Sequence, residues 1–106
     1  AMEQLLAMPE PPDAVFCFND LMAIGAIRAC VEQGVDVPGQ VAIAGFDDIA
    51  EGRFGNPTLT TVAADLGFLA AEALRLVQAR IADPDRPAES VSVPWTLRLR
   101  ESSIGR

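Results

Sequence analysis

The stretch Val41-Ala42-Ile43-Ala44-Gly45-Phe46-Asp47-Asp48 decides the fold of this chain. Its first four residues are apolar without alternation, which is typical of a parallel strand with both faces buried. The run then ends in two carboxylates. Because ligands of open α/β sheets bind outside the carboxyl ends of the strands, Asp47 and Asp48 are predicted to lie where a ligand would sit.

The preceding residues predict a strand–helix–strand unit. Residues 14–18 form a second continuous apolar run, which predicts another buried strand. Asn19 or Asp20 can cap the helix that follows, and Gly34 can stand after its end. The expected inner face of this helix is made of apolar residues at helical spacing, namely Leu21, Ile24, Ile27 and Val31. Crossovers of this length join parallel strands, so the predicted fold class is α/β with a parallel sheet.

The second half of the chain predicts one long helix between two shorter strands. We expect a helical turn capped by an aspartate after residue 48, a strand over 59–63, and a helix over 66–81 capped by Asp65. The tail over 91–99 alternates apolar and polar residues, which predicts a half-buried strand interrupted at Pro94. Trp95, within that strand, is expected in the core.

The composition excludes several function classes. Half of the 106 residues are hydrophobic, which favours a packed core, and the net charge of -7 argues against a nucleic-acid surface. The chain has no histidine, so we expect no zinc site, no histidine-based catalysis and no cofactor. No apolar stretch reaches the length of about 20 residues that a membrane helix needs. Cys17 and Cys30 lie in apolar segments and are expected to be buried, reduced thiols.

Asn19 and Asp47 are the candidate ligand-contacting residues. Each follows a predicted strand, so their side chains should emerge on one edge of the sheet. An amide supplies donors and an acceptor, and an ionised carboxylate supplies acceptors, which together suit a sugar or nucleoside. Alternatively, both residues only cap the following helices. For Asn19 both interpretations stay open, whereas Asp48 offers a second cap, which favours a ligand role for Asp47.

Asp20 and Asp48 are expected to serve as caps and hydrogen-bonding struts. Adjacent acids can also form a metal site or a catalytic dyad. The sequence offers neither a third metal ligand nor an activated nucleophile beside them, so we assign no metal ligand and no catalytic residue.

Three motifs in order resemble the lactose-repressor/galactose-repressor (LacI/GalR) family of bacterial transcription regulators. They are residues 12–26 (PDAVFCFNDLMAIGA), residues 37–49 (VPGQVAIAGFDDI) and residues 57–62 (PTLTTV). The tail over residues 97–103 (LRLRESS) also fits, so the resemblance covers nearly everything from Pro12 onward.

The resemblance implies a fold and a set of site residues. The fold is the type I periplasmic-binding-protein-like sandwich, in which a small effector binds between two α/β lobes. Asn19 and Asp47 match effector-contacting positions of that family, and Leu66 matches a position that lines the cleft. Residues 1–106 would then be a C-terminal fragment of the effector-binding domain. Residues 14–62 would form the core of the C-terminal lobe, and the helix over 66–81 would pack on the N-terminal lobe.

The resemblance also implies partners and a location. The parent would be a cytoplasmic, homodimeric regulator that binds a sugar-like or nucleoside-like effector and contacts DNA only through a head domain that this sequence lacks. A sugar-binding protein of an ABC transport system shares the fold and is the alternative function. An enzyme is the least supported class. The apolar stripe of the helix over 66–81 also predicts that the chain self-associates.

Overall fold

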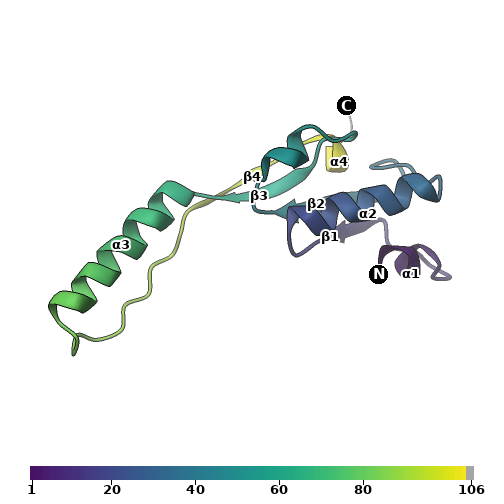
Figure 1. Ribbon diagram of the computed structural model, residues 1–106. Helices are drawn as coiled ribbons and strands as arrows, with labels where there is room; N and C mark the ends of the chain where they lie inside the picture. Colours follow the sequence, from purple (N-terminus) through teal and green to yellow (C-terminus); the bar gives the residue numbers. More distant parts are fainter. Residues whose placement is uncertain (105–106) are drawn as a thin grey trace. The chain divides into compact units, whose positions relative to one another are not determined.

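The computed structural model describes residues 1–104 (Figure 1). In chain order its elements are α1 (Met2–Leu6), β1 (Ala14–Phe16), α2 (Asp20–Glu32), β2 (Ala42–Phe46), the 3-10 helix η1 (Ala50–Arg53), β3 (Thr60–Ala64), α3 (Leu66–Ala82), β4 (Trp95–Arg98) and α4 (Glu101–Ile104). The chain divides into two compact units. The first comprises residues 1–63 with the segment that starts at Leu97, and the second comprises residues 64–96.

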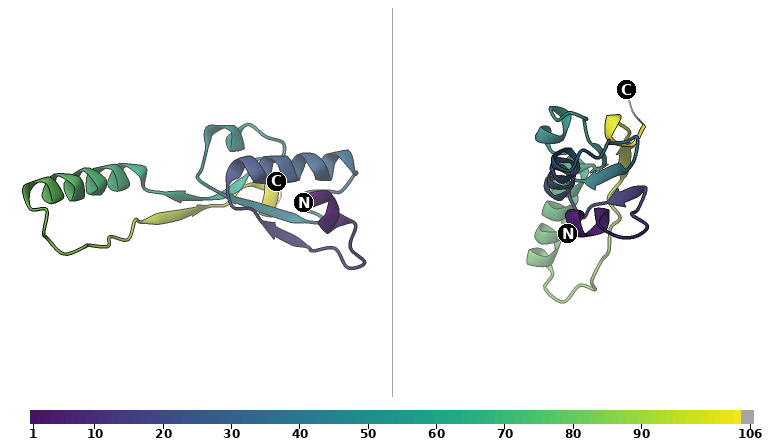
Figure 2. Two further views of the ribbon diagram at one scale, coloured as in Figure 1. Left: turned by 60° about the horizontal axis from the view of Figure 1, so that its bottom comes forward. Right: turned by 90° about the vertical axis from the view of Figure 1, so that its right-hand side faces the viewer.

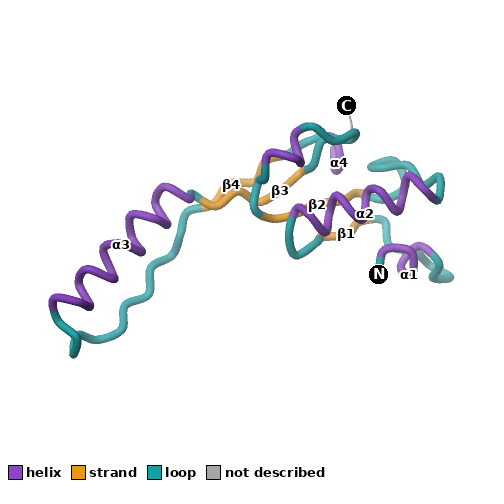
Figure 3. Tube along the Cα trace, viewed as in Figure 1, coloured by secondary structure: helices purple, strands orange, loops and turns teal. Residues whose placement is uncertain are grey.

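The strands form one sheet in the order β1-β2-β3-β4 (Figure 3). β1 is parallel to β2, with Ala14 opposite Ala42 and Phe16 opposite Ala44. β2 is parallel to β3, with Ala44 opposite Thr60. The helix α2 makes the crossover between β1 and β2, so the predicted strand–helix–strand unit and its parallel strands are confirmed.

β4 runs antiparallel to β3. The Asp65 amide donates to the Pro94 carbonyl over 2.8 Å, and the Arg100 amide donates to Thr60 Oγ1 over 2.8 Å. The chain order of the two partners is reversed between these bonds, which is the pattern of an antiparallel neighbour. The strand starts directly after Pro94, where the sequence predicts an interruption. The prediction of a half-buried strand is wrong, because all four residues of β4 are exposed.

Trp95 is 69% exposed, so its predicted place in the core is also wrong. Alternation of apolar and polar residues shows only that a strand has an apolar face. Burial of that face needs a second layer, and no part of the described chain covers β4.

The core of the first unit lies between α2 and the sheet (Figure 2). It is formed by apolar residues of α1, α2 and β2 and of the positions that flank the strands, namely Met2, Cys17, Ala23, Ala26, Ile27, Cys30, Val41, Ile43 and Leu59. Both thiols are free and buried, as predicted, and burial raises the pKa of the Cys17 and Cys30 thiols.

The buried face of α2 agrees with the predicted one at Ile27, which is buried, and at Ile24, which packs against the core, but it differs at the two ends. Leu21 and Val31 are 67% and 55% exposed, whereas Ala23, Ala26 and Cys30 face the sheet. The residues that are buried include the charged Asp20, at the first position of the helix. Small side chains at this face let the helix approach β2 closely, and the bulkier Leu21 and Val31 then point outward.

β1 is shorter and more exposed than predicted. It ends at Phe16, which is 64% exposed, and Phe18 is 87% exposed. β1 lies at the end of the sheet, and α2 covers only one of the faces of that sheet. The prediction that both faces of this strand are buried is therefore wrong. In β2 the two faces differ less in exposure than in β1: Ile43 and Gly45 are buried, and Ala42 and Ala44 are only partly exposed.

The second unit contains α3. The Asp65 carboxylate accepts a hydrogen bond of 2.9 Å from the Phe68 amide, which confirms the predicted cap. No residue of α3 is buried, and its apolar stripe of Leu66, Leu69, Leu74, Val77 and Ile81 is 45% to 74% exposed. None of the helices within residues 1–104 has both the length and the apolar character that a membrane span requires.

Candidate functional site

Asn19 and Asp47 lie at the same edge of the sheet, beyond the carboxyl ends of β1 and β2. The last paired positions of these parallel strands are Phe16 and Ala44. Asn19 and Asp47 each follow those positions by three residues, so the register places them level with each other. Both predicted site residues thus lie at the edge where α/β sheets bind ligands.

Asn19 is the N-cap of α2. Its Oδ1 accepts a hydrogen bond of 2.9 Å from the Met22 amide. The capping alternative therefore holds for this residue. The bond uses the amide oxygen, and the side-chain NH₂ group, which can donate twice, makes no hydrogen bond within the described chain.

Asp47 caps no helix. The N-cap of η1 is Ile49, and no side chain caps that helix, so the predicted aspartate-capped turn is wrong. Asp47 is exposed, and its carboxylate has no hydrogen bond or ion pair with residues 1–104. Its backbone has φ 115, a left-handed conformation that favours glycine, and Asp48 follows with φ 53. Non-glycine residues hold such angles only when surrounding contacts impose them.

The backbone amides of this loop are all held. The Asp47 amide donates to the Val62 carbonyl over 3.0 Å. The Asp48 amide donates to Thr61 Oγ1 over 3.3 Å, and the Ile49 amide donates to Asp20 Oδ2 over 2.9 Å. Consequently the loop is fixed from β3 and α2, and the Asp47 carboxylate is the acidic group that it leaves unpaired.

Asp20 is a buried strut beneath the loop, as its predicted hydrogen-bonding role requires. Its side chain is fully buried, and its Oδ1 accepts a hydrogen bond of 2.5 Å from the Thr61 hydroxyl. Gly45 lies directly against it, since a Cβ at that position would stand 2.4 Å from Asp20 Oδ1. Only a residue without a side chain leaves room for the carboxylate here.

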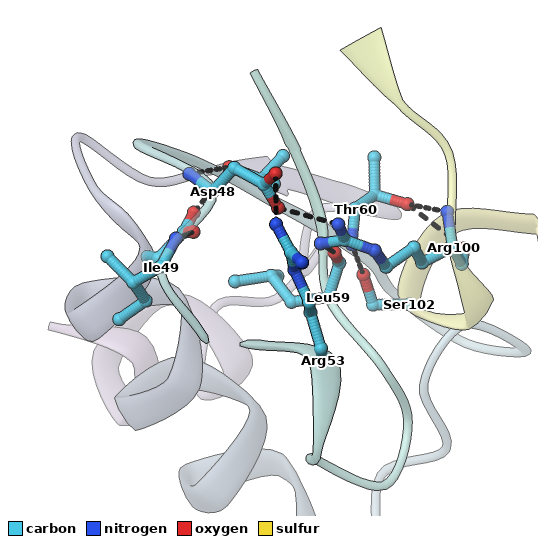
Figure 4. A network of polar contacts seen from close by, with 9 residues as sticks. Asp48, Ile49, Arg53, Leu59, Thr60, Arg100 and Ser102 are labelled. Atoms are coloured by element: carbon cyan, nitrogen blue, oxygen red, sulfur yellow. Dashed lines mark hydrogen bonds and ion pairs between the residues drawn. The ribbon is translucent and has the colours of Figure 1, made fainter. Parts of the chain in front are cut away.

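The Asp48 carboxylate bonds to two arginines that reach it from different segments of the chain (Figure 4). Arg53 of η1 donates to Oδ2 over 2.9 Å, and Arg100 donates to Oδ1 over 2.6 Å. Desolvation raises the pKa of Asp48, but the hydrogen bonds and charges of Arg100 and Arg53 outweigh it and hold that pKa below its ordinary value. Asp48 is therefore a hydrogen-bonding strut, as the sequence predicts, but its carboxylate bonds to arginine side chains and not to the backbone amides of a helix.

The segment after β4 is fastened to β2 and β3. Arg100 also donates to the Leu59 carbonyl over 2.8 Å. Ser102, which is fully buried, donates to the Ile43 carbonyl over 2.6 Å. It also accepts from the Thr60 amide over 2.8 Å (Figure 4). The sequence analysis noted this segment only as part of a motif. The charged Arg100 and the two serines that follow Glu101 are the signal from which its hydrogen bonds to the sheet could have been predicted.

Leu66 is the first residue of α3, in the second unit, and it is 65% exposed. Its grouping with Asn19 and Asp47 stays a prediction. Over the described range 1–104, no three side chains of the types that bind metals are grouped as a metal site would need.

Comparison with known proteins places the fold in a class. Residues 1–103 match the family model described as a periplasmic binding protein-like domain. The HTH-type transcriptional repressor PurR of Mannheimia succiniciproducens is 42% identical over 101 residues, which is 95% of this chain and 30% of that protein.

Solved structures give the same result. A LacI-family transcriptional regulator from Sanguibacter keddieii matches with a TM-score of 0.87 and 42% identity, over 99% of this chain and 40% of the other. The complex of the transcriptional regulator CelR with cellobiose matches with a TM-score of 0.89 and 32% identity, over 97% of this chain and 32% of the other.

The parallel sheet and the matching family model define a periplasmic-binding-protein-like α/β domain. Within that class the chain belongs to the LacI/GalR family, as the resemblance of its motifs predicts. It spans about a third of the length of the relatives that it matches.

Proposed function

We propose that this chain is part of the effector-binding domain of a LacI/GalR-type transcriptional regulator. Asn19 and Asp47 contact a small hydroxylated effector, and Leu66 lines the same cleft. The effector is a sugar or a nucleoside-like molecule. The relationship to CelR, whose structure contains cellobiose, supports the sugar class.

The observation that carries this proposal is the free carboxylate of Asp47. The three amides from Asp47 to Ile49 are all hydrogen-bonded, and the carboxylate of Asp48 is paired, but that of Asp47 is exposed and unpaired. Holding a loop in a left-handed conformation costs free energy of about 1–3 kcal/mol per residue, and such conformations gather at functional sites. A carboxylate presented in this way can accept hydrogen bonds from neighbouring hydroxyl groups of a ligand.

The proposal extends to the arrangement of the parent protein. Residues 14–62 belong to the C-terminal lobe, and the helix over 66–81 packs on an N-terminal lobe. The exposed apolar stripe of α3 supports this assignment, because such a surface is normally covered. The parent works in the cytoplasm as a homodimer and contacts DNA through a separate head domain. We assign no catalytic role to any residue.

Substitution of Asp47 tests the proposal in a protein that contains the whole effector domain. Glucose, cellobiose, adenosine and cytidine are titrated as probes by calorimetry. For the probe that binds, Asp47→Ala removes a charge-assisted hydrogen bond and should weaken affinity by about 1.5–3 kcal/mol, which is about tenfold or more. Asp13→Ala is the matched control, because Asp13 is an exposed aspartate at the opposite end of β1.

The proposal requires that Asp47→Ala weakens binding while thermal unfolding stays unchanged and Asp13→Ala binds normally. Equal affinity of the Asp47→Ala variant and the wild type would refute the role of Asp47. The isolated 106-residue chain is expected to give no saturable binding, because a cleft ligand needs both of its walls.

A further inference from the structure

The Asp47–Asp48 loop is connected to two segments that lie far from it in sequence. Thr61, in β3, accepts a hydrogen bond of 3.3 Å from the Asp48 amide. Arg100, directly beyond β4, forms an ion pair of 2.6 Å with the Asp48 carboxylate. The chain enters its second unit at the last residue of β3 and returns from it within β4. Hence both segments that connect the units also hold this loop.

The ion pair with Arg100 differs from the one with Arg53. The Arg53 side chain is 56% exposed, whereas that of Arg100 is 18% exposed and that of Asp48 is 11% exposed. Exposed ion pairs contribute little, because water screens them, but partly buried pairs with several hydrogen bonds hold a defined geometry. Arg100 also donates to the Leu59 carbonyl over 2.8 Å, so its planar guanidinium spans the loop and β3 (Figure 4).

The bonds of Arg100 act on the backbone that presents Asp47. Asp47 and Asp48 have φ values of 115 and 53, which a free chain would leave readily. Of the two aspartate carboxylates, only that of Asp48 is hydrogen-bonded to other described residues. Release of that carboxylate would leave the peptide between the two aspartates held by a single bond of 3.3 Å, from the Asp48 amide to Thr61 Oγ1. We expect that peptide to turn more readily, and the free carboxylate of Asp47 to turn with it.

We propose that Arg100 is a positioning residue for effector binding: by holding Asp48 it fixes the left-handed loop and thereby the direction of the Asp47 carboxylate. This inference rests on the proposed function of Asp47. It adds a physical link between the ligand edge and β4, one of the two segments that connect the units. Arg100 itself contacts no effector in this proposal.

Hydrogen exchange of backbone amides, measured by NMR on the complete chain without ligand, tests the positioning role. In Arg100→Gln the amides of Asp48 and Ile49 should exchange about tenfold faster, relative to the amide of Ile43 in the core. Arg98→Gln is the matched control, because Arg98 is an exposed arginine of β4 that makes no ion pair or side-chain hydrogen bond with the described residues. It should leave all three exchange rates unchanged.

Two further variants separate positioning from a general loss of stability. Ser102→Ala removes buried hydrogen bonds to Ile43 and Thr60 and should accelerate exchange throughout the unit without selecting the loop. Arg100→Lys keeps the positive charge and should restore part of the protection that Arg100→Gln loses. Loop exchange that is unchanged in Arg100→Gln, or that rises only in parallel with Ile43, would overturn the inference.

A double-mutant cycle connects the positioning role to binding. In the whole effector domain, titrated with the probe that binds among glucose, cellobiose, adenosine and cytidine, Arg100→Gln should lower affinity several-fold. In the Asp47→Ala background the same change should have no further effect, because the carboxylate that it positions is gone. Additive effects would contradict the inference while leaving the role of Asp47 intact. A normal affinity of Asp47→Ala would instead refute the proposed function, and the exchange measurement would still decide the role of Arg100 in the loop.

Discussion

Removal of the buried Asp20 carboxylate should destabilise the first unit strongly. This side chain is fully buried and accepts hydrogen bonds from the Thr61 hydroxyl at 2.5 Å and the Ile49 amide at 2.9 Å. Asp20→Ala leaves both donors without a partner in the interior. Each unsatisfied buried donor costs about 1–3 kcal/mol, and the small cavity adds to that cost.

The expected loss is about 3–5 kcal/mol, which is a large part of the 5–15 kcal/mol that stabilises a typical domain. Relief of the desolvation of a buried charge lowers the loss, so it should not exceed this range. Thr61→Val removes a single hydroxyl from the same pair and should cost about 1.5–3 kcal/mol. Because the two side chains share one hydrogen bond, the double variant should lose less than the two single losses added together.

Urea denaturation followed by far-UV circular dichroism measures these free energies of unfolding. Asp13→Ala, at an exposed aspartate, should change the free energy of unfolding by less than about 0.5 kcal/mol. A loss below about 1 kcal/mol for Asp20→Ala, or strictly additive effects with Thr61→Val, would show that the hydrogen bonds of Asp20 to Thr61 and Ile49 do not stabilise the Asp47–Asp48 loop.

Further predictions concern a glycine, the pH dependence and the exposed helix. Gly45→Ala places a methyl group where a buried carboxylate lies 2.4 Å away, so the melting temperature should fall markedly, and an unchanged value would contradict the packing described. The pKa of Asp48 is lowered in the folded state, so the stabilisation from its pair with Arg100 is present above the ordinary pKa of 3.8 and is lost as the pH falls below it. Stability curves of wild type and Asp48→Asn should therefore converge in acid and separate near neutral pH. The chain should also form a dimer in gel filtration with light scattering, because burying the half-exposed stripe of α3 would contribute about 5–10 kcal/mol. Leu69→Asp combined with Leu74→Asp should yield a monomer, and a monomeric wild type at high micromolar concentration would refute this expectation.

The sequence by itself determined the main strands and helices from β1 to β4 and their order, although not the helix α4 after them. Unbroken apolar runs at 14–18 and 41–46 gave β1 and β2, and their connection through one helix required them to be parallel. Asn19 and Asp65 lie in front of helices and cap them, because a cap needs only its own side chain and the next three amides. The candidate site at the ends of β1 and β2 was predicted from the same local information, since Asp47 directly follows β2 and Asn19 lies three residues beyond β1.

Only the tertiary structure decided which residues are buried and what holds the loop. Phe16 and Trp95 lie in apolar strand patterns but are exposed, since burial depends on whether another layer covers the face. Asp48 looks like a helix cap in sequence, yet its carboxylate pairs with Arg100, 52 residues away. Gly45 is required by the approach of Asp20 from another element. Periodicity and capping act over a few residues, whereas these contacts exist only once distant segments have packed together.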